Sequence, residues 1–470
     1  MIRRGAAVKN AHALLLCLAA ASCRQATPTA ADRVEAPPTA RPAPVSADAG
    51  PREGATARRL SALADELAGR MATVRNLPVL RPIARGVMSR EAVVERLRRR
   101  TRQEYPPGEL DLEGASLERL GLIPAGTDYE RTMFDLLDEQ VLGFYDPDEH
   151  RLYIADWVPA EMQPATMAHE LTHALQDQHF DIGRFTHHVR GRGDAQTAAM
   201  AVVEGDATAA MLDFALAPAG RTVLDLPDVT SSVAGQMSGD QPRLSAAPRA
   251  LRESLLFPYL SGLRLCVDRL RAGGHGAIDQ LLARPPESTE QVMHADKLAS
   301  REAPVEVPAV VPAPLAADFE LAYHDVLGEF GTRLVLAEGV TDARAQSGAQ
   351  GWGGDRAMLL VPRGSLAPEG DGGVRASDEA LARSALVWVS VTDPGRPHDD
   401  AEAQELSGLL ATVLAHRYAA APTARVAGAL AARAVAEGRV SLVASRGRTV
   451  VFADRVPAAR AAALVSTLLP

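Results

Sequence analysis

The chain has 470 residues, a length that predicts two or three domains rather than one. Apolar residues make up 47% of the sequence and aromatic residues only 4%, so hydrophobic cores built mainly of Ala, Leu and Val are expected. The formal net charge is -9, and no basic stripe stands out in the sequence, so nucleic acid is not expected as a partner.

The N-terminus has the layout of a secretory signal peptide. A basic stretch precedes an apolar run, residues 11–21, that is too short to span a membrane. Small residues then lead to Cys23, an arrangement that resembles a bacterial lipobox, in which the signal is cut before the cysteine and the thiol receives lipid. The sequence therefore predicts a signal peptide over residues 1–22 and an exported lipoprotein, anchored to a cell-envelope membrane through Cys23. An ordinary signal peptide is the alternative.

The residues that follow the signal predict a tether. Residues 23–55 are rich in Ala, Pro, Thr and Arg, a composition that cannot bury a core. Once the signal is removed and Cys23 is lipidated, Cys266 is the one remaining thiol, so an intrachain disulfide framework is excluded. Cys266 lies in an apolar helical pattern and is expected to be a core residue rather than a nucleophile.

Helices dominate the region after the tether. Apolar residues recur every three or four positions from Thr56, and Ser89 is a suitable N-cap for a second helix. Two short apolar runs between residues 142 and 154 flank an Asp-Pro-Asp turn, which predicts a β-hairpin. The predicted helices cover residues 56–71, 89–103, 128–141, 164–178, 194–216 and 252–272.

The C-terminal part of the chain has a different character. Residues 303–314 contain four prolines and are predicted to form a linker. Strand-like runs and helical runs then alternate, which predicts a smaller α+β domain over residues 315–470, with no role assigned to it. The expected fold class is therefore α+β, with a mainly helical domain and a small sheet over residues 56–302. The predicted C-terminal strands cover residues 357–361, 385–391 and 440–451, and the helices cover 401–418 and 457–469.

The segment His169-Glu170-Leu171-Thr172-His173 carries the chemistry. Two histidines four residues apart on a helix lie on the same face and can share one cation. Zinc binds imidazole nitrogen readily, and a hydrolytic zinc site keeps one position for water. Glu170 could reach that water and accept its proton. The sequence predicts one Zn²⁺ per chain, held by His169 and His173, with Glu170 as the general base.

A third ligand is needed, because two histidines do not hold a catalytic zinc ion. Glu204 is the leading candidate, since it stands in an otherwise apolar helix where an uncompensated charge would be costly. A buried ion pair or a place at a helix boundary would also explain it. Gly205 is expected to let the metal or the first helix approach closely. His179 has the spacing of the third metzincin histidine, but Gln176 replaces the glycine of that pattern, so His179 should point away.

The His-Glu-x-x-His segment, followed by Glu204-Gly205-Asp206-Ala207, resembles the gluzincin (peptidase-MA-like) zinc metallopeptidases, in which two helices supply His, His and Glu. Residues 168–178 also look like those of poorly characterised bacterial lipoproteins. The resemblance implies hydrolysis of peptide bonds in a peptide or protein. It also implies an edge strand that pairs with the substrate, a place that Leu152-Tyr153-Ile154 would fill, unless the hairpin is purely structural. The gap from His173 to Glu204 is longer than in thermolysin-like enzymes, so an insertion should loop out.

Peptide hydrolysis also requires a group that stabilises the oxyanion. Tyr259 and His294 are the candidates, with a structural role as the alternative for each. The competing function is an inactive relative that keeps the fold and binds partners in the cell envelope. The complete motif argues against it, because a binding module has no need of Glu170. The sequence does not predict the oligomeric state.

Overall fold

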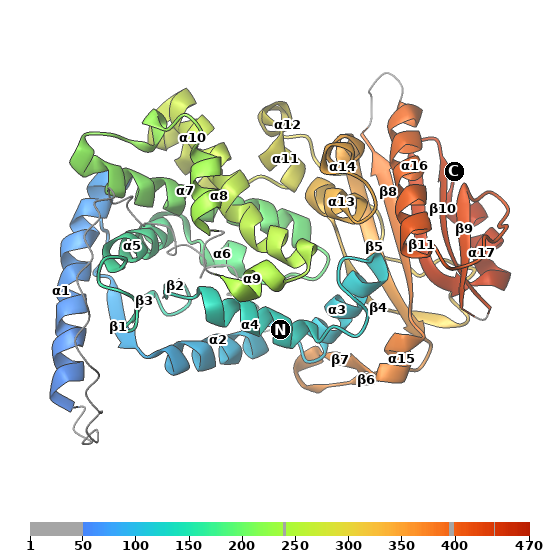
Figure 1. Cartoon of the computed structure of the whole chain (residues 1–470), viewed down its shortest axis with the longest axis horizontal. Coiled ribbons are helices and arrows are strands. Elements are labelled where there is room, and N and C mark those ends of the chain that lie inside the picture. The colour runs from blue at the N-terminus through green and yellow to red at the C-terminus, as the bar shows by residue number, and fades with distance from the viewer. Residues whose placement is uncertain (1–49, 238–240, 394–398, 437) are drawn as a thin grey trace, which may run out of the picture.

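The computed structural model of the chain describes residues 50–237, 241–393, 399–436 and 438–470. The predicted signal peptide, Cys23 and most of the predicted tether lie outside these residues. The described chain is α+β, as predicted, with a mainly helical part followed by a part built on a larger sheet (Figure 1). No helix within the described ranges combines the length and the apolar character needed to cross a membrane.

The helical part keeps the predicted order and adds short elements. Its first helix begins at Gly50, so the end of the predicted tether is helical. The helices are α1 (Gly50–Arg75), α2 (Arg90–Glu104), α3 (Glu109–Leu120), α4 (Tyr129–Gln140), α5 (Gln163–Phe180), α6 (Gly183–Thr186), α7 (Gly193–Leu216), α8 (Val229–Met237), α9 (Pro242–Ala246), α10 (Arg249–Ala283), α11 (Thr289–Met293) and α12 (Ala295–Ser300), with 3-10 turns at Ala217–Ala219 and Val223–Asp225.

Local chemistry accounts for several helix boundaries. The Ser89 side chain accepts a hydrogen bond from the Ala92 amide and begins α2, as predicted. Pro164 stands in the first turn of α5, where its missing N–H is not needed. The long helix α10 is kinked at Gly273 and Gly274, and Gly274 has a positive φ of 62° that favours glycine. Helix α10 also buries Cys266 completely, which confirms it as a core residue.

A three-stranded sheet lies under α5. Its strands are β1 (Ala84–Met88), β2 (Gly143–Asp146) and β3 (Arg151–Ala155), in the order β1-β3-β2. The predicted hairpin is thus confirmed as β2 and β3. The prediction that Leu152-Tyr153-Ile154 forms an edge strand is wrong. Strand β1 pairs in parallel with β3 and places these residues in the centre of the sheet. The strand with a free edge beside α5 is β2.

The C-terminal part is built on a six-stranded antiparallel sheet in the order β4-β5-β8-β11-β10-β9. Alternate residues of β8 face opposite sides: Trp388 packs against α16 on one face, and Val387 shares a cluster with α17 on the other. The six strands are β4 (Phe319–Asp325), β5 (Trp352–Pro362), β8 (Ala385–Thr392), β9 (Ala431–Ala436), β10 (Arg439–Arg446) and β11 (Thr449–Pro457), and a separate two-stranded sheet is formed by β6 (Leu366–Pro368) and β7 (Val374–Ala376). The helices are α13 (Gly328–Ala337), α14 (Asp342–Ala349), α15 (Asp378–Ala382), α16 (Asp399–Arg417) and α17 (Ala458–Leu468), with a 3-10 turn at Gly370–Gly372.

One of the hydrophobic clusters spans the two parts, while others lie wholly within one part. A single cluster runs from Val202 of α7 and Leu282 of α10 to Leu334 of α13 and Leu410 of α16. Helix α3 also packs against the larger sheet, although it precedes the hairpin in the sequence. The predicted linker has no regular structure, but it lies against the sheet with Val307 buried. Side-chain packing therefore crosses the predicted boundary at residues 303–314, and the division into two domains stays a prediction.

Candidate metal centre

Two neighbouring helices bring the predicted metal ligands together. His169 and His173 stand one turn apart on α5, and Glu204 faces them from α7, which packs beside α5. Their ligand atoms all lie within 4.8 Å of one another. Nε2 of His169 is 2.9 Å from Nε2 of His173 and 3.1 Å from Oε2 of Glu204. Nε2 of His173 is 3.5 Å from the same oxygen. The three side chains form one cluster that could hold a metal ion.

The cluster leaves some of its own polar atoms without hydrogen bonds, and its spacing suits a metal ion. All three side chains are 0% exposed, yet Nδ1 of His169 and Oε1 of Glu204 have no hydrogen-bond partner among the described residues. Zinc bonds of about 2.0–2.1 Å in tetrahedral geometry place neighbouring ligand atoms roughly 3.3 Å apart. The observed separations of 2.9 Å, 3.1 Å and 3.5 Å bracket that value, so small side-chain shifts would admit the ion.

Within the cluster, His173 and Glu204 favour opposite charges, positive on the imidazole and negative on the carboxylate. Burial opposes a charged His173, but the carboxylate of Glu204 outweighs it and raises the pKa of His173 to about 9. Burial also opposes a charged Glu204, and the His173 imidazolium reverses this effect and lowers the pKa of Glu204. Burial lowers the pKa of His169 to about 4, which keeps that ring neutral. A metal ion would take the place of the His173 proton.

Glu170 lies next to His169 on α5 and points toward the small sheet. Its side chain is 3% exposed, and Oε2 accepts a hydrogen bond of 2.8 Å from the backbone N–H of Tyr145. Burial raises the pKa of Glu170 to about 8, although His173 acts in the opposite direction. The predicted base is therefore held by the free edge of β2. Sequence reasoning missed Tyr145, because a backbone donor leaves no mark in a side-chain pattern.

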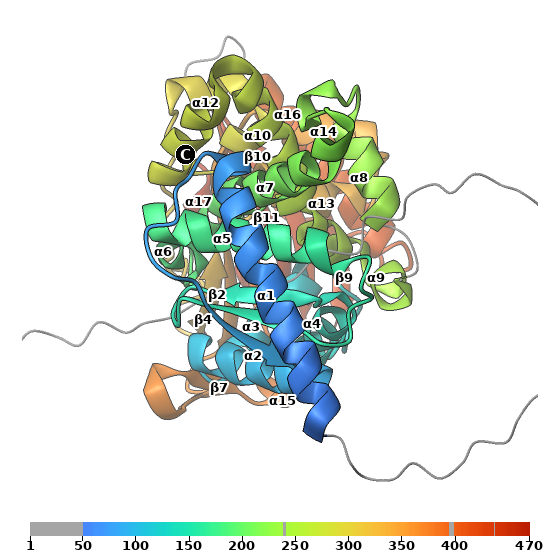
Figure 2. The ribbon, with the colours of Figure 1, turned by 90° about the vertical axis from the view of Figure 1, so that its left-hand side faces the viewer.

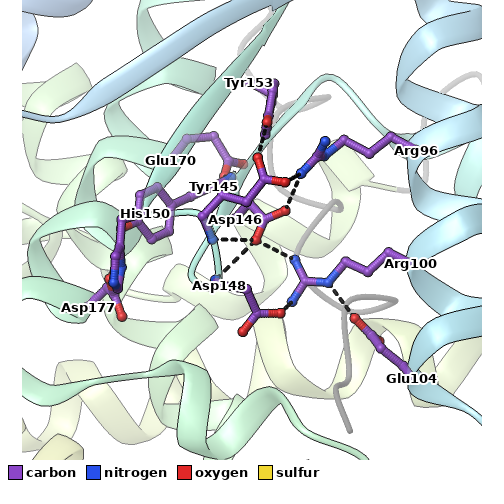
Figure 3. A network of polar contacts seen from close by, with 11 residues as sticks. Arg96, Arg100, Glu104, Tyr145, Asp146, Asp148, His150, Tyr153, Glu170 and Asp177 are labelled. Atoms are coloured by element: carbon purple, nitrogen blue, oxygen red, sulfur yellow. Dashed lines mark hydrogen bonds and ion pairs between the residues drawn. The ribbon is translucent and has the colours of Figure 1, made fainter. Parts of the chain in front are cut away.

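The turn after β2 is held by arginines of α2. Figure 3 shows the carboxylate of Asp146 between the guanidinium groups of Arg96 and Arg100, at 3.0 Å and 3.3 Å. The same carboxylate accepts hydrogen bonds from the backbone N–H groups of Asp148 and Glu149. Asp146 is 2% exposed, so these charged contacts are largely shielded from water. They fix β2, and with it the N–H group that holds Glu170.

His179, the alternative third ligand, lies away from the cluster. Helix α5 continues through His179, as expected without the metzincin glycine. The His179 ring is at the exposed end of the helix, with Nε2 2.8 Å from the backbone oxygen of Pro78. The insertion predicted between His173 and Glu204 is present as α6 and its flanking turns. Geometry therefore favours Glu204 over His179 as the third ligand.

Gly205 lies at a close contact between helices, but the partner differs from the prediction. The backbone of Gly262 on α10 approaches it, rather than a metal site or α5. A Cβ atom at Gly205 would lie 2.1 Å from the carbonyl carbon of Gly262, and one at Gly262 would lie 1.9 Å from the carbonyl oxygen of Ala201. The two glycines thus let α7 and α10 cross closely, directly behind Glu204.

The substitution Gly205→Ala is expected to destabilise the fold by about 3 kcal/mol, the upper part of the usual range for overpacking, because the atoms that it meets belong to backbone. Urea unfolding measures the change. Gly69→Ala is the matched control, since Gly69 is exposed on α1 with no atom within 4 Å of the added Cβ. That control should stabilise the protein by about 0.5–1 kcal/mol. A Gly205→Ala protein as stable as the wild type would contradict the close crossing.

The two candidates for the oxyanion group lie in different places. Tyr259 of α10 is 1% exposed, and its ring centre is 6.3 Å from that of His169, at the border of the cluster. His294 lies between α11 and α12, with Nε2 2.8 Å from Oε1 of Glu329, and this bond raises the pKa of His294. Nothing described joins His294 to the cluster. Both catalytic roles stay predictions.

One hollow borders Glu170, and a larger one lies between the two parts of the chain. The smaller one, about 10 Å³, is lined by Glu170, Gly143 of β2 and Tyr153 of β3, and has room for about one water molecule. The larger one, about 220 Å³, lies between the two parts of the chain and is lined mainly by apolar side chains. Pro258 lines it, next in sequence to Tyr259. Apolar cavities of this kind are typical places for a ligand, but none of the three clustered side chains lines this one.

Comparison with known proteins adds little to this geometry. The sequence matches no known protein family, and it matches no curated protein. A crystal structure from Chloroflexus aurantiacus, described as that of a proposed hydrolase with a novel fold, overlaps with this chain at a TM-score of 0.30 and 18% identity. The overlap covers 55% of this chain and 92% of that chain. A similarity this low transfers neither fold nor activity, so the likeness to gluzincins stays a resemblance.

Proposed function

We propose that the protein is an exported, lipid-anchored zinc metallopeptidase. The observation that carries the proposal is the buried cluster of His169, His173 and Glu204, with the carboxylate of Glu170 on the adjoining position of the same helix. Two imidazoles and one carboxylate are a donor set found at hydrolytic zinc sites. Export and attachment through Cys23 rest on the N-terminal sequence and belong to the same proposal.

The residues of the chain have distinct parts in the proposed reaction. Zinc bound by His169, His173 and Glu204 would supply a Lewis acid that activates water and polarises the peptide carbonyl. Glu170 accepts the proton of the attacking water and passes it to the leaving amine. The N–H group of Tyr145 orients the Glu170 carboxylate, so that the base is already aligned before the substrate arrives.

The buried cluster has to become accessible before a peptide can bind to it. The ligands are 0% exposed, and the hollow beside Glu170 has a volume of only about 10 Å³. A peptide is far larger than one water molecule, so the wall of this hollow must move when a peptide binds. The complete burial also favours a second candidate function, in which the metal is structural and the protein binds envelope partners without cleaving them.

Elemental analysis and a cleavage assay test the proposal together. The purified full chain is expected to contain about one zinc ion and to cleave unfolded casein. A chelator should remove both the zinc and the cleavage, and added zinc should restore them. A chain that contains no zinc and recovers none from solution would overturn the metal centre. A chain that holds zinc but cleaves neither casein nor short peptides would favour the structural metal site.

A further inference from the structure

We infer that Gln176, Asp206 and Arg75 form a positioning chain that fixes which nitrogen of His173 faces the metal. This inference rests on the proposed metal centre but not on peptide cleavage. It concerns the side of His173 that points away from the cluster. Every link in the chain is a contact between described side chains of this protein.

The chain of contacts is continuous and buried. Nδ1 of His173 lies 2.9 Å from Oε1 of Gln176. Nε2 of Gln176 donates to the backbone oxygen of Val203 at 3.0 Å and to Oδ2 of Asp206 at 2.8 Å. Nε of Arg75 donates to Oδ1 of Asp206 at 2.6 Å. Arg75, Gln176 and Asp206 are all at most 1% exposed, so water does not compete for these groups.

Groups that can only donate or only accept fix the direction of each hydrogen bond in the chain. Arginine has only donors, so Arg75 must donate to Asp206. The Val203 carbonyl can only accept, so the group of Gln176 that faces it must be the amide nitrogen, which also donates to Oδ2 of Asp206. The amide oxygen of Gln176 then has to face His173. Nδ1 of His173 must therefore carry a proton and donate it.

This assignment leaves Nε2 of His173 as the nitrogen that can bind a metal. A neutral imidazole carries one proton, and the contact with Gln176 holds that proton on Nδ1. Nε2 is also the nitrogen that faces His169 and Glu204. Partners of this kind hold a metal-binding imidazole in one tautomer and one ring orientation. His169 differs, because its Nδ1 has no hydrogen-bond partner among the described residues.

The chain also ties separate helices to the centre. Arg75 is the last residue of α1, the long helix in front of α5 in Figure 2, and its second guanidinium nitrogen donates to Asp279 of α10 at 2.6 Å. Helices α1, α5, α7 and α10 thus meet at one buried network behind His173. Arg75 holds one carboxylate oxygen of Asp206, and the other oxygen accepts the amide N–H of Gln176.

The substitution Asp206→Asn tests the direction of the chain with almost no change of shape. Arg75 would still donate, now to the amide oxygen of the new side chain, which turns its NH₂ group toward Gln176. The Gln176 amide then meets an NH₂ donor on one side and the Val203 carbonyl on the other, so its orientation is no longer fixed, and part of the molecules present N–H groups to Nδ1 of His173. That arrangement favours a proton on Nε2, where the metal should bind. We expect zinc affinity, measured by chelator competition, to fall about 10- to 100-fold.

Asp279→Asn is the matched control. Asp279 contacts the same arginine but is 31% exposed, and Asp206 still holds Arg75 in that variant. Zinc affinity should change by less than about threefold, well below the effect of altering a partner of the ligand. A fall in Asp279→Asn as large as that in Asp206→Asn would overturn the inference, since it would point to general weakening of the helix contacts.

An NMR signature separates positioning from mere stability. In the zinc-loaded wild type labelled with ¹⁵N-histidine, the Nδ1–H signal of His173 should exchange slowly with water, while that of His169 serves as the internal reference. In Asp206→Asn the His173 signal should exchange faster relative to His169. Unchanged affinity together with an unchanged His173 signal would overturn the inference. Wild-type protein that binds zinc without cleaving peptides would overturn only the proposed peptidase activity.

Discussion

The substitution Glu170→Gln is expected to lower the rate of peptide hydrolysis by about 10²- to 10⁴-fold while zinc stays bound. Glutamine has the size of glutamate, and its amide oxygen can still accept the hydrogen bond from the Tyr145 N–H group. An amide cannot take up a proton at neutral pH, so the step assigned to the carboxylate is lost. Cleavage of a fluorescent peptide and zinc content are measured on the same preparation.

Glu161→Gln is the control for this variant. It makes the same chemical change on an exposed residue just before α5 and should leave both cleavage and zinc content unchanged. Loss of zinc from Glu170→Gln would show that Glu170 supports the metal directly. Cleavage at the wild-type rate with zinc bound would remove Glu170 from the mechanism and direct attention to another base.

The metal cluster is the part of the structure that the sequence predicted best, for two physical reasons. Helical periodicity alone places His169 and His173 on one face of a helix. A carboxylate within an apolar helix needs compensation, and Glu204 is such a carboxylate. The structure buries Glu204 completely against both histidines, so the three side chains do form one cluster, and its binding of zinc stays a prediction.

The surroundings of the cluster could not be predicted in the same way. Strand β1 has little β-sheet character of its own and forms by pairing with β3, so nothing local showed that β3 would become the central strand. Arg75 and Asp206 are separated by 131 residues and meet only because α1 crosses α5 and α7. Packing between the two parts likewise depends on contacts distant in sequence, because α3 reaches the large sheet only through tertiary packing. Contacts distant in sequence decide all three features.

The substitution Glu204→Gln is expected to weaken zinc binding by more than about 100-fold, because the loss of a charged ligand should exceed the roughly 10- to 100-fold effect of altering a partner of a ligand. Glutamine preserves the volume of the buried side chain, so the comparison is made on folded protein. Glu204→Ala is the less informative change, since it also removes the volume of a fully buried side chain and leaves a cavity between the helices. Competition with a zinc chelator of known affinity measures the loss.

His179→Ala is the decisive comparison, because His179 is the alternative third ligand. Its ring contacts the Pro78 carbonyl at the exposed end of α5, whereas Glu204 is 0% exposed and lies 3.1 Å from His169. Zinc affinity should therefore stay at the wild-type value in His179→Ala and fall in Glu204→Gln. The reverse result would require the end of α5 to unwind and turn His179 inward, a metzincin-like arrangement. Such unwinding would break the helical hydrogen bonds beyond Gln176 and would leave the Glu204 carboxylate buried without a metal.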